Sequence, residues 1–171
     1  MSSDPPVVTT RVGWGFDAHA LNEEPPLLLG GVEVSNNQGL TATSDGDVLA
    51  HAITDATLGA CVLGDLGEHF PSSDPRFQGV TSLALLSEAA RMAAAAGYVV
   101  SHVDATVIAE QIRVAPHRQA IRENLAAALG IPTDVISVKA TTTDGLGFTG
   151  ASQGVAAVAV VTVIPDSITR S

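Results

Sequence analysis

Apolar and polar residues alternate along this chain with two different periods, and segments of one period follow segments of the other. Apolar residues recur at alternate positions or run together in four segments, which predicts strands over residues 11–18, 98–109, 135–140 and 154–163. Helical spacing predicts helices over residues 45–63, 82–96 and 116–129. Such an alternation is typical of an α/β domain. We therefore expect one mixed sheet of four strands with helices packed on it.

A small β-hairpin is expected before the first of these helices. A run of three leucines at residues 27–29 and the segment Val32-Glu33-Val34 flank the turn-forming pair Gly30 and Gly31. Residues 35–39 are expected to form a loop, and Ser44 is predicted to be the N-cap of the first helix.

The length of 171 residues suits a single domain with a sizeable core. We place that domain at residues 11–165 and expect flexible tails at 1–10 and 166–171. Residues 154–163 are almost continuously apolar, as in a strand that is buried on both faces. The chain's own helices would cover one of those faces, so we expect other copies of the chain to cover the second face, as in a homo-oligomer.

The charge of the chain limits its partners. The formal net charge is −10, and Lys139 is the only lysine. Binding to a nucleic-acid backbone needs a basic surface, so nucleic acid is disfavoured as a partner. Any phosphate ligand would have to be held by a metal ion, by backbone amides and by hydroxyl groups.

The compartment is indicated by cysteine usage and by the absence of targeting signals. The single cysteine, Cys61, excludes an internal disulfide framework and suits a reducing compartment. No apolar run approaches the roughly 20 residues of a membrane span, and the N-terminus lacks the pattern of a signal peptide. We expect a cytoplasmic protein, in a bacterial cytosol, with no membrane partner.

A metal site is predicted from residues in two segments. Asp17 and His19 are two positions apart in an extended segment, so their side chains point the same way. If the helix that carries His51 lies beside this strand, the three residues form a two-nitrogen, one-oxygen ligand set of the kind found in catalytic zinc sites. The alternative is that His51 is a buried histidine with a hydrogen bond to Asp55.

A glycine-rich loop after the third predicted strand is a second candidate site. Residues 141–150 hold four threonines, three glycines and Asp144. Glycines allow close approach of the backbone to an anion, and Asp144 can hold a hard cation such as Mg²⁺ that bridges phosphate oxygens. The alternative is a glycine-rich hairpin in which the threonine hydroxyls cap turns. The loop by itself does not separate the two interpretations.

A third candidate is the junction between a strand and a helix at residues 109–117. Backbone groups at such a junction lie at a sheet edge, where they can bind a base or another small ligand. Arg113 is one of few basic residues in this acidic chain and is a candidate phosphate contact.

Together these motifs closely resemble the 2-C-methyl-D-erythritol 2,4-cyclodiphosphate synthase family of the non-mevalonate isoprenoid pathway. The resemblance extends from Arg11 to about Val163. It rests on Gly15-Phe16-Asp17-Ala18-His19, Ser44-Asp45-Gly46-Asp47-Val48 with His51, Leu63-Gly64-Asp65-Leu66-Gly67, Phe70-Pro71, Ala115-Pro116-His117, Lys139-Ala140-Thr141-Thr142-Thr143 and Leu146-Gly147-Phe148-Thr149-Gly150.

The resemblance implies a homotrimer with active sites between subunits, in which Asp17, His19 and His51 bind Zn²⁺ or another divalent transition metal. Asp144 would bind Mg²⁺ or Mn²⁺. The residues implied for substrate binding are Ser44, Asp65, Gly67, Phe70, Ser72, Asp74, Ala109, Arg113, Val114, Ala115, Ala140, Thr141, Thr142, Asp144 and Phe148. Thr142 falls on the position assigned to transition-state stabilisation.

Several positions depart from the family pattern. Thr43, the second candidate catalytic residue, stands where the family usually has a histidine that helps to hold substrate phosphate. A threonine hydroxyl can donate a hydrogen bond to phosphate but carries no charge. The other departures are Ser72 for Asp, Asp144 for Glu, Ala151 for Arg and Gln153 for Glu.

The implied enzyme is a phosphorus–oxygen lyase. It would convert 4-diphosphocytidyl-2-C-methyl-D-erythritol 2-phosphate, a cytidyl-diphosphate substrate, into the cyclic diphosphate and CMP. Two alternatives remain open. One is a non-catalytic trimer that binds a nucleotide or an isoprenoid phosphate on the same fold. The other is an unrelated zinc phosphohydrolase with Asp47 or Asp55 as base, although we expect both carboxylates to orient His51 instead.

Overall fold

The main sheet has five strands, in the order β4-β1-β7-β5-β6. A computed structural model describes the backbone of residues 9–169; the predicted tail residues 1–8 and 170–171 lie outside the described part. The strands are β1 (Arg11–Asn22), β4 (Gly39–Leu40), β5 (Tyr98–Ile108), β6 (Ile136–Thr141) and β7 (Gly154–Pro165). β5 and β6 are parallel and the other neighbouring pairs are antiparallel, so the predicted mixed sheet is confirmed.

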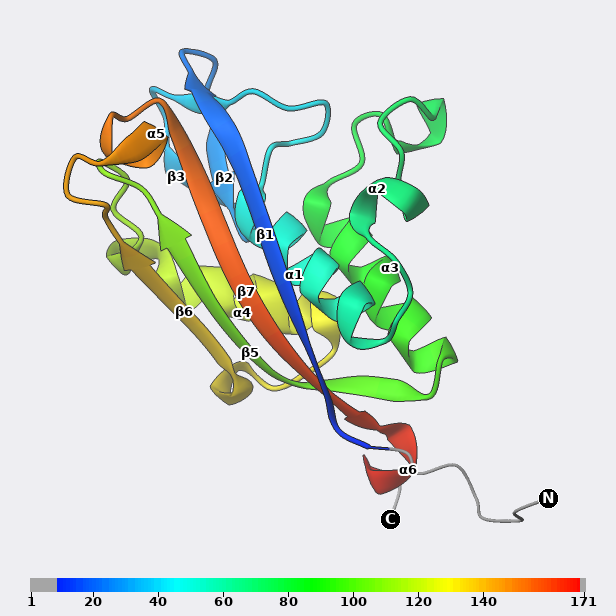
Figure 1. The fold of residues 1–171 in the computed structure, drawn as a ribbon. Helices are drawn as coiled ribbons and strands as arrows, with labels where there is room; N and C mark the ends of the chain where they lie inside the picture. Colours follow the sequence, from blue (N-terminus) through cyan, green and yellow to red (C-terminus); the bar gives the residue numbers. More distant parts are fainter. Residues whose placement is uncertain (1–8, 170–171) are drawn as a thin grey trace.

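Three helices cover one face of this sheet (Figure 1), namely α1 (Val48–Ala60), α3 (Ser82–Ala95) and α4 (Arg118–Leu129). The core lies between these helices and the sheet, and it is built almost entirely from aliphatic side chains. The predicted hairpin forms from β2 (Leu27–Leu29) and β3 (Val32–Ser35). The short elements are α2 (Leu66–His69), η1 (Pro75–Phe77), η2 (Ala115–His117), η3 (Thr133–Val135), α5 (Gly147–Gly150) and α6 (Asp166–Thr169). Among the described helices, none has the length and apolar character needed to cross a lipid bilayer.

The prediction of four strands is wrong by one. The additional strand, β4, lies partly in the expected loop, and its pairs with β1 are Leu21 with Leu40 and Asn22 with Gly39. A strand of two residues is too short to show an alternation of apolar and polar positions, so only its pairing with β1 defines it. At the other end of the chain, the helical turn α6 forms from residues that we expected in a tail.

The start of α1 also differs from the prediction. Asp47, and not Ser44, is the N-cap, because its carboxylate accepts a hydrogen bond from the Ala50 N–H at 3.0 Å. The same carboxylate accepts a hydrogen bond at 2.7 Å from the N–H of Gly31, in the turn of the β-hairpin. The fully buried Asp47 therefore fixes the hairpin against the beginning of α1.

Two glycines of β1 allow α1 to lie directly on the sheet. A Cβ atom added at Gly13 would lie 1.8 Å from the carbonyl oxygen of Ala56, and one added at Gly15 would lie 2.0 Å from that of Ala52. Real Cβ atoms do not approach so closely, so any side chain at either position would force the helix away. Asp17 and His19 follow Gly15 on the same face of β1 and consequently point toward the first turns of α1.

The opposite face of the sheet is open in the single chain. The β1 side chains Trp14 and Phe16 are 63% and 45% exposed, and their rings stack with centroids 6.3 Å apart. Trp14 is paired in the register with Val160 of β7, which is also exposed. The expectation that residues 154–163 are buried on both faces therefore holds, within one chain, only near the start of β7.

The glycine contact predicts the effect of Gly15→Ala. The added methyl group must push α1 away from β1, and overpacking of this kind costs about 1–3 kcal/mol of unfolding free energy. Gly59→Ala is the matched control, because a Cβ at this exposed position of α1 meets no atom within 4 Å. The control should gain up to about 1 kcal/mol from better helix propensity. Chemical denaturation of the two variants measures the difference, and equal stability of Gly15→Ala and the parent would refute the proposed constraint.

Candidate metal centre and substrate cavities

Three potential ligand atoms from β1 and α1 meet at one point. The Nδ1 atom of His51 lies 2.9 Å from Oδ2 of Asp17, and Nε2 of His19 lies 3.1 Å from the same oxygen. All three ligand atoms lie within 4.8 Å of one another. The prediction that these residues come together is confirmed, and the close approach of α1 to β1 is the reason.

His19 is held with an electron pair directed at this point. Its Nδ1 atom lies 2.9 Å from the carbonyl oxygen of Thr41, which accepts hydrogen bonds only, so Nδ1 carries the proton. The other ring nitrogen, Nε2, is buried and has no hydrogen-bond partner of good geometry, although it lies close to Asp17. A metal-binding histidine has this arrangement, with one nitrogen donating to a carbonyl and the other left for the ion.

The charges in the cluster support the same conclusion. Burial raises the pKa of the Asp17 carboxyl, but the close contacts with His19 and His51 and the attraction of their charge outweigh burial and hold this pKa well below its ordinary value. The close contact with the Asp17 carboxylate raises the pKa of His19, against the effect of burial. Each imidazole needs a proton on the nitrogen that faces the Asp17 carboxylate. A divalent cation can replace these protons and bind the same three atoms. The two nitrogens and one oxygen fit a transition metal and leave its fourth position open.

The expectation that Asp47 and Asp55 orient His51 is wrong. Asp47 caps α1, as described above, and Asp55 accepts a hydrogen bond at 2.7 Å from the N–H of Leu66. Burial raises the pKa of both carboxyls. The Nε2 atom of His51 instead lies 2.8 Å from the hydroxyl of Ser82 and 3.4 Å from that of Ser44. Ser82 was missed because it is 31 positions away in the sequence and belongs to no recognised motif.

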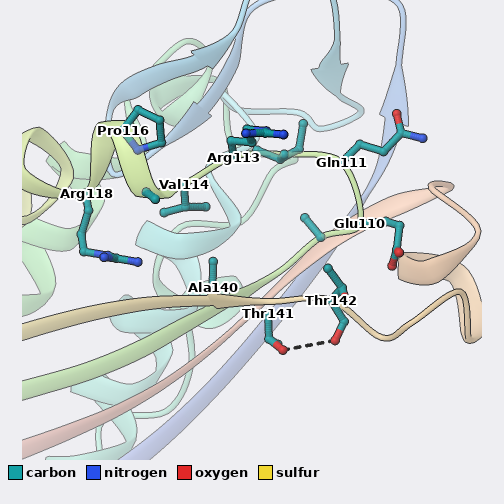
Figure 2. A pocket seen from close by; sticks show the side chains of 12 residues that line it. Glu110, Gln111, Arg113, Val114, Pro116, Arg118, Ala140, Thr141 and Thr142 are labelled. Atoms are coloured by element: carbon teal, nitrogen blue, oxygen red, sulfur yellow. Dashed lines mark hydrogen bonds between the residues drawn. The ribbon is translucent and has the colours of Figure 1, made fainter.

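A cavity of about 650 Å³ lies beyond the ends of β5 and β6. Figure 2 shows the segment around Arg113 on one side and the end of β6, with Thr141 and Thr142, on the other. The predicted binding residues that line it are Ala109, Arg113, Val114, Ala115, Ala140, Thr141 and Thr142. The sequence did not mark two charged residues of the lining, Arg118 at the start of α4 and Glu110, whose buried Oε2 has no hydrogen-bond partner among the described residues.

A smaller cavity of about 180 Å³ adjoins the metal cluster, because His51 forms part of its wall. The predicted residues that line it are Thr43, Ser44, Gly67, Phe70 and Ser72. The remaining lining is Leu66 of α2, Phe77 at the end of η1, Gln78 and Leu85 of α3. Phe77, Gln78 and Leu85 have no polar motif that would mark them as part of a site.

Four predicted binding residues line neither cavity in the single chain. Asp65 caps α2, and Asp74 caps η1 and pairs with Arg76, whose hydrogen bond lowers the pKa of the Asp74 carboxyl. Asp144 is exposed and accepts a hydrogen bond at 3.1 Å from the Thr142 hydroxyl. Phe148 is 46% exposed and lies against Gly154.

The large cavity and the metal cluster belong to different parts of the sheet. The cluster is attached to β1 and the large cavity to β5 and β6, and β7 and β5 separate β1 from β6. Three strand spacings place β1 and β6 roughly 14 Å apart. The lining residues of the two cavities do not overlap.

Comparison with known proteins identifies the family. The sequence profile of the YgbB family matches residues 10–164. The 2-C-methyl-D-erythritol 2,4-cyclodiphosphate synthase of Trichlorobacter lovleyi is 50% identical over 156 residues, which covers 91% of this chain and 99% of that protein. Two solved structures of a synthase with the same name, one of them a CDP-bound form, have TM-scores of 0.83 and 0.82 at 38% identity and cover 90% of this chain and 99% of theirs. The similarity spans nearly the entire length of both partners, and the chain belongs to the YgbB family.

Proposed function

We propose that this protein converts 4-diphosphocytidyl-2-C-methyl-D-erythritol 2-phosphate into 2-C-methyl-D-erythritol 2,4-cyclodiphosphate and CMP, a step of non-mevalonate isoprenoid biosynthesis. The convergence of Asp17, His19 and His51 beside a hydroxyl-lined cavity carries the proposal. The names of the relatives support it, and so does the CDP bound to one structural neighbour.

The reaction is an intramolecular phosphoryl transfer. An oxygen of the substrate's 2-phosphate attacks the β-phosphorus, a new phosphorus–oxygen bond closes the ring, and the bond to the α-phosphate oxygen breaks, so that CMP leaves with the electron pair. Phosphoryl transfer depends mainly on positioning and on neutralising charge. A nucleophile within the same molecule gains further from being held close to its target.

The side chains at the cavities suit these requirements. Asp17, His19 and His51 would hold Zn²⁺, or another divalent transition metal, which when bound supplies a Lewis acid for phosphate oxygens. Thr43 and Ser44, in the wall next to His51, would donate hydrogen bonds to the 2-phosphate. The exposed Asp144 carboxylate suits Mg²⁺ or Mn²⁺, ions that are commonly held by one or two carboxylates together with substrate phosphates.

The large cavity suits the cytidine end of the substrate. The backbone around Ala109 and Ala140 would receive the base, Arg113 would attract phosphate, and the Thr142 hydroxyl would stabilise charge on the transferring phosphoryl group. Asp65 and Gly67, beside the smaller cavity, would bind the ribose. We expect the reaction to take place in the cytosol, where the buried thiol of Cys61 would stay reduced.

A homotrimer with active sites between subunits would combine these two halves. In one chain the cytidine cavity and the metal cluster lie on different strands, and the open sheet face presents Trp14, Phe16 and Val160 to solvent. Exposed apolar surface of this kind marks interaction sites. Packing of this face against other copies would bury it and could bring the metal cluster of one chain next to the cytidine cavity of a neighbour.

The activity is tested by a phosphorus NMR time course with the cytidyl-diphosphate substrate, Zn²⁺ and Mg²⁺. The parent should produce the cyclic diphosphate and CMP, and His51→Ala should be slower by about 100-fold or more, because it lacks the charge stabilisation at the phosphate. No turnover by a metal-loaded, oligomeric parent would instead favour a binding protein on this fold, and release of inorganic phosphate would indicate a phosphohydrolase.

Metal removal is expected to lower the thermal stability of the parent. An ion that binds only the folded state adds about 2.7 kcal/mol at a free concentration 100 times its Kd. A chelator should therefore lower Tm for the parent and leave His51→Ala unchanged. The matched control, His102→Ala, removes an exposed imidazole of β5 and should respond to the chelator as the parent does. An equal loss of the metal response in both variants would exclude the triad as the specific site.

Phe16→Glu is predicted to disrupt the oligomer. The change places a charge on the open apolar face, and burying that charge between subunits would be costly. Sedimentation velocity should show smaller species, and turnover should fall because each site loses its second half. Ala94→Glu, on the exposed surface of α3, is the control and should remain assembled and active. A fully assembled Phe16→Glu protein would rule out this face as the interface.

A further inference from the structure

His51 is connected to a second carboxylate through a buried serine. The hydroxyl of Ser82 lies 2.8 Å from Nε2 of His51 and makes a close hydrogen bond to Oδ1 of Asp45. The backbone N–H of Ser82 donates to the other oxygen of Asp45 at 2.9 Å. Ser82 is fully buried at the first residue of α3, and its partners Asp45 and His51 are half-buried.

The direction of each hydrogen bond between His51, Ser82 and Asp45 follows from the groups involved. A carboxylate only accepts hydrogen bonds, so the single hydroxyl hydrogen of Ser82 must point to Asp45. The Ser82 oxygen can then only accept from His51, which puts the ring proton on Nε2. The other nitrogen, Nδ1, lies 2.9 Å from Oδ2 of Asp17, so its proton is the one that a bound metal ion would replace. Thr41 fixes the opposite tautomer of His19 in the same way, through its carbonyl oxygen.

We propose that Asp45 and Ser82 are positioning residues of the metal centre, which hold His51 in the one tautomer that presents Nδ1 to the ion. The inference rests on the metal site of the proposed function and extends it to two residues that do not touch the ion. Hydrogen bonds to the second nitrogen of a ligating histidine set its orientation and its basicity.

The same link connects the metal centre to the wall of the smaller cavity. Ser82 directly follows the loop that contains Phe77 and Gln78, and Leu85 lies one turn further along α3. A shift of this wall would therefore change the nearest acceptor that the described residues offer to Nε2 of His51, since the Ser44 hydroxyl lies at the longer distance of 3.4 Å.

A purely structural role for Asp45 is the competing explanation. Its carboxylate also accepts a hydrogen bond from the Asp47 N–H at 3.4 Å and so ties the turn before α1 to the start of α3. In such a structural role, it would not matter whether the Ser82 hydroxyl donates to Asp45 or to His51. The tautomer of His51 therefore separates the two explanations.

Asp45→Asn should reverse the direction of the hydrogen bond between Ser82 and His51, with almost no change in the size of the side chain. The Ser82 N–H still requires an acceptor, so the amide oxygen should face it and the amide NH₂ should face the Ser82 hydroxyl. The hydroxyl hydrogen would then turn toward His51 Nε2 and favour the tautomer with its proton on Nδ1, which blocks the ligand atom. Ser82→Ala removes the acceptor altogether.

The experiment is a Co²⁺ titration of the full chain, followed by the visible absorption of the bound ion. Both Ser82→Ala and Asp45→Asn should bind Co²⁺ about 10- to 100-fold more weakly than the parent. The control is Thr57→Val, which removes another fully buried hydroxyl, one that donates to Ile53 within α1. The control should stay within twofold of the parent.

Long-range ¹H–¹⁵N spectra of the Zn²⁺-loaded parent provide a second, independent measurement. The proposal requires a proton on Nε2 of His51 and metal on Nδ1, and the opposite assignment overturns it. Parent-like Co²⁺ affinity in a folded Ser82→Ala or Asp45→Asn protein also overturns it, and if one variant fails to fold, the other decides. A parent that binds no Co²⁺ would instead refute the metal centre itself, so the two failures are distinguishable.

Discussion

The close approach of α1 to β1 is the contact on which the rest of the site depends. Gly13 and Gly15 provide space for the carbonyl oxygens of the helix, and the strand therefore carries its ligands past the first turns of α1. With any larger residue at either position, α1 would be pushed away from β1, and His51 would move away from Asp17 with it. The packing of α1 on β1 therefore also determines how Asp17, His19 and His51 lie relative to one another. The buried Asp47 adds to it by fixing where the helix begins.

The orientation of the ligands depends on a second layer of buried acceptors. The Thr41 carbonyl lies next to β4, and the two-residue pairing of β4 with β1 brings this part of the chain beside His19. Ser82 and Asp45 perform the corresponding role for His51 from α3 and from the turn before α1. A minimal strand and the start of a helix, neither of which carries a residue of the triad, therefore orient the two imidazole rings.

The sequence predicted the ligand triad and most of the lining of the large cavity, because both lie in short contiguous motifs at the ends of well-marked elements. It did not predict β4 or the role of Ser82, because each is defined by a partner distant in the chain and has no local pattern. The N-cap was misplaced for a similar reason. Ser44 and Asp47 are both good caps locally, and Asp47 is favoured because the Gly31 N–H, from the hairpin, gives its carboxylate a second donor.

The acidity of the chain bears on how the proposed site would attract its substrate. With a net charge of −10 and a single lysine, the surface as a whole repels a diphosphate. Arg113 and Arg118 supply positive charge at the large cavity, but the cluster around Asp17 has its favourable charge for phosphate only when a cation is bound there. A substrate with phosphates at both ends of a flexible linker is therefore attracted to two separated points. Subunit packing that sets the spacing between those points would also set how far the substrate must bend, and bending brings its own nucleophile to the phosphorus.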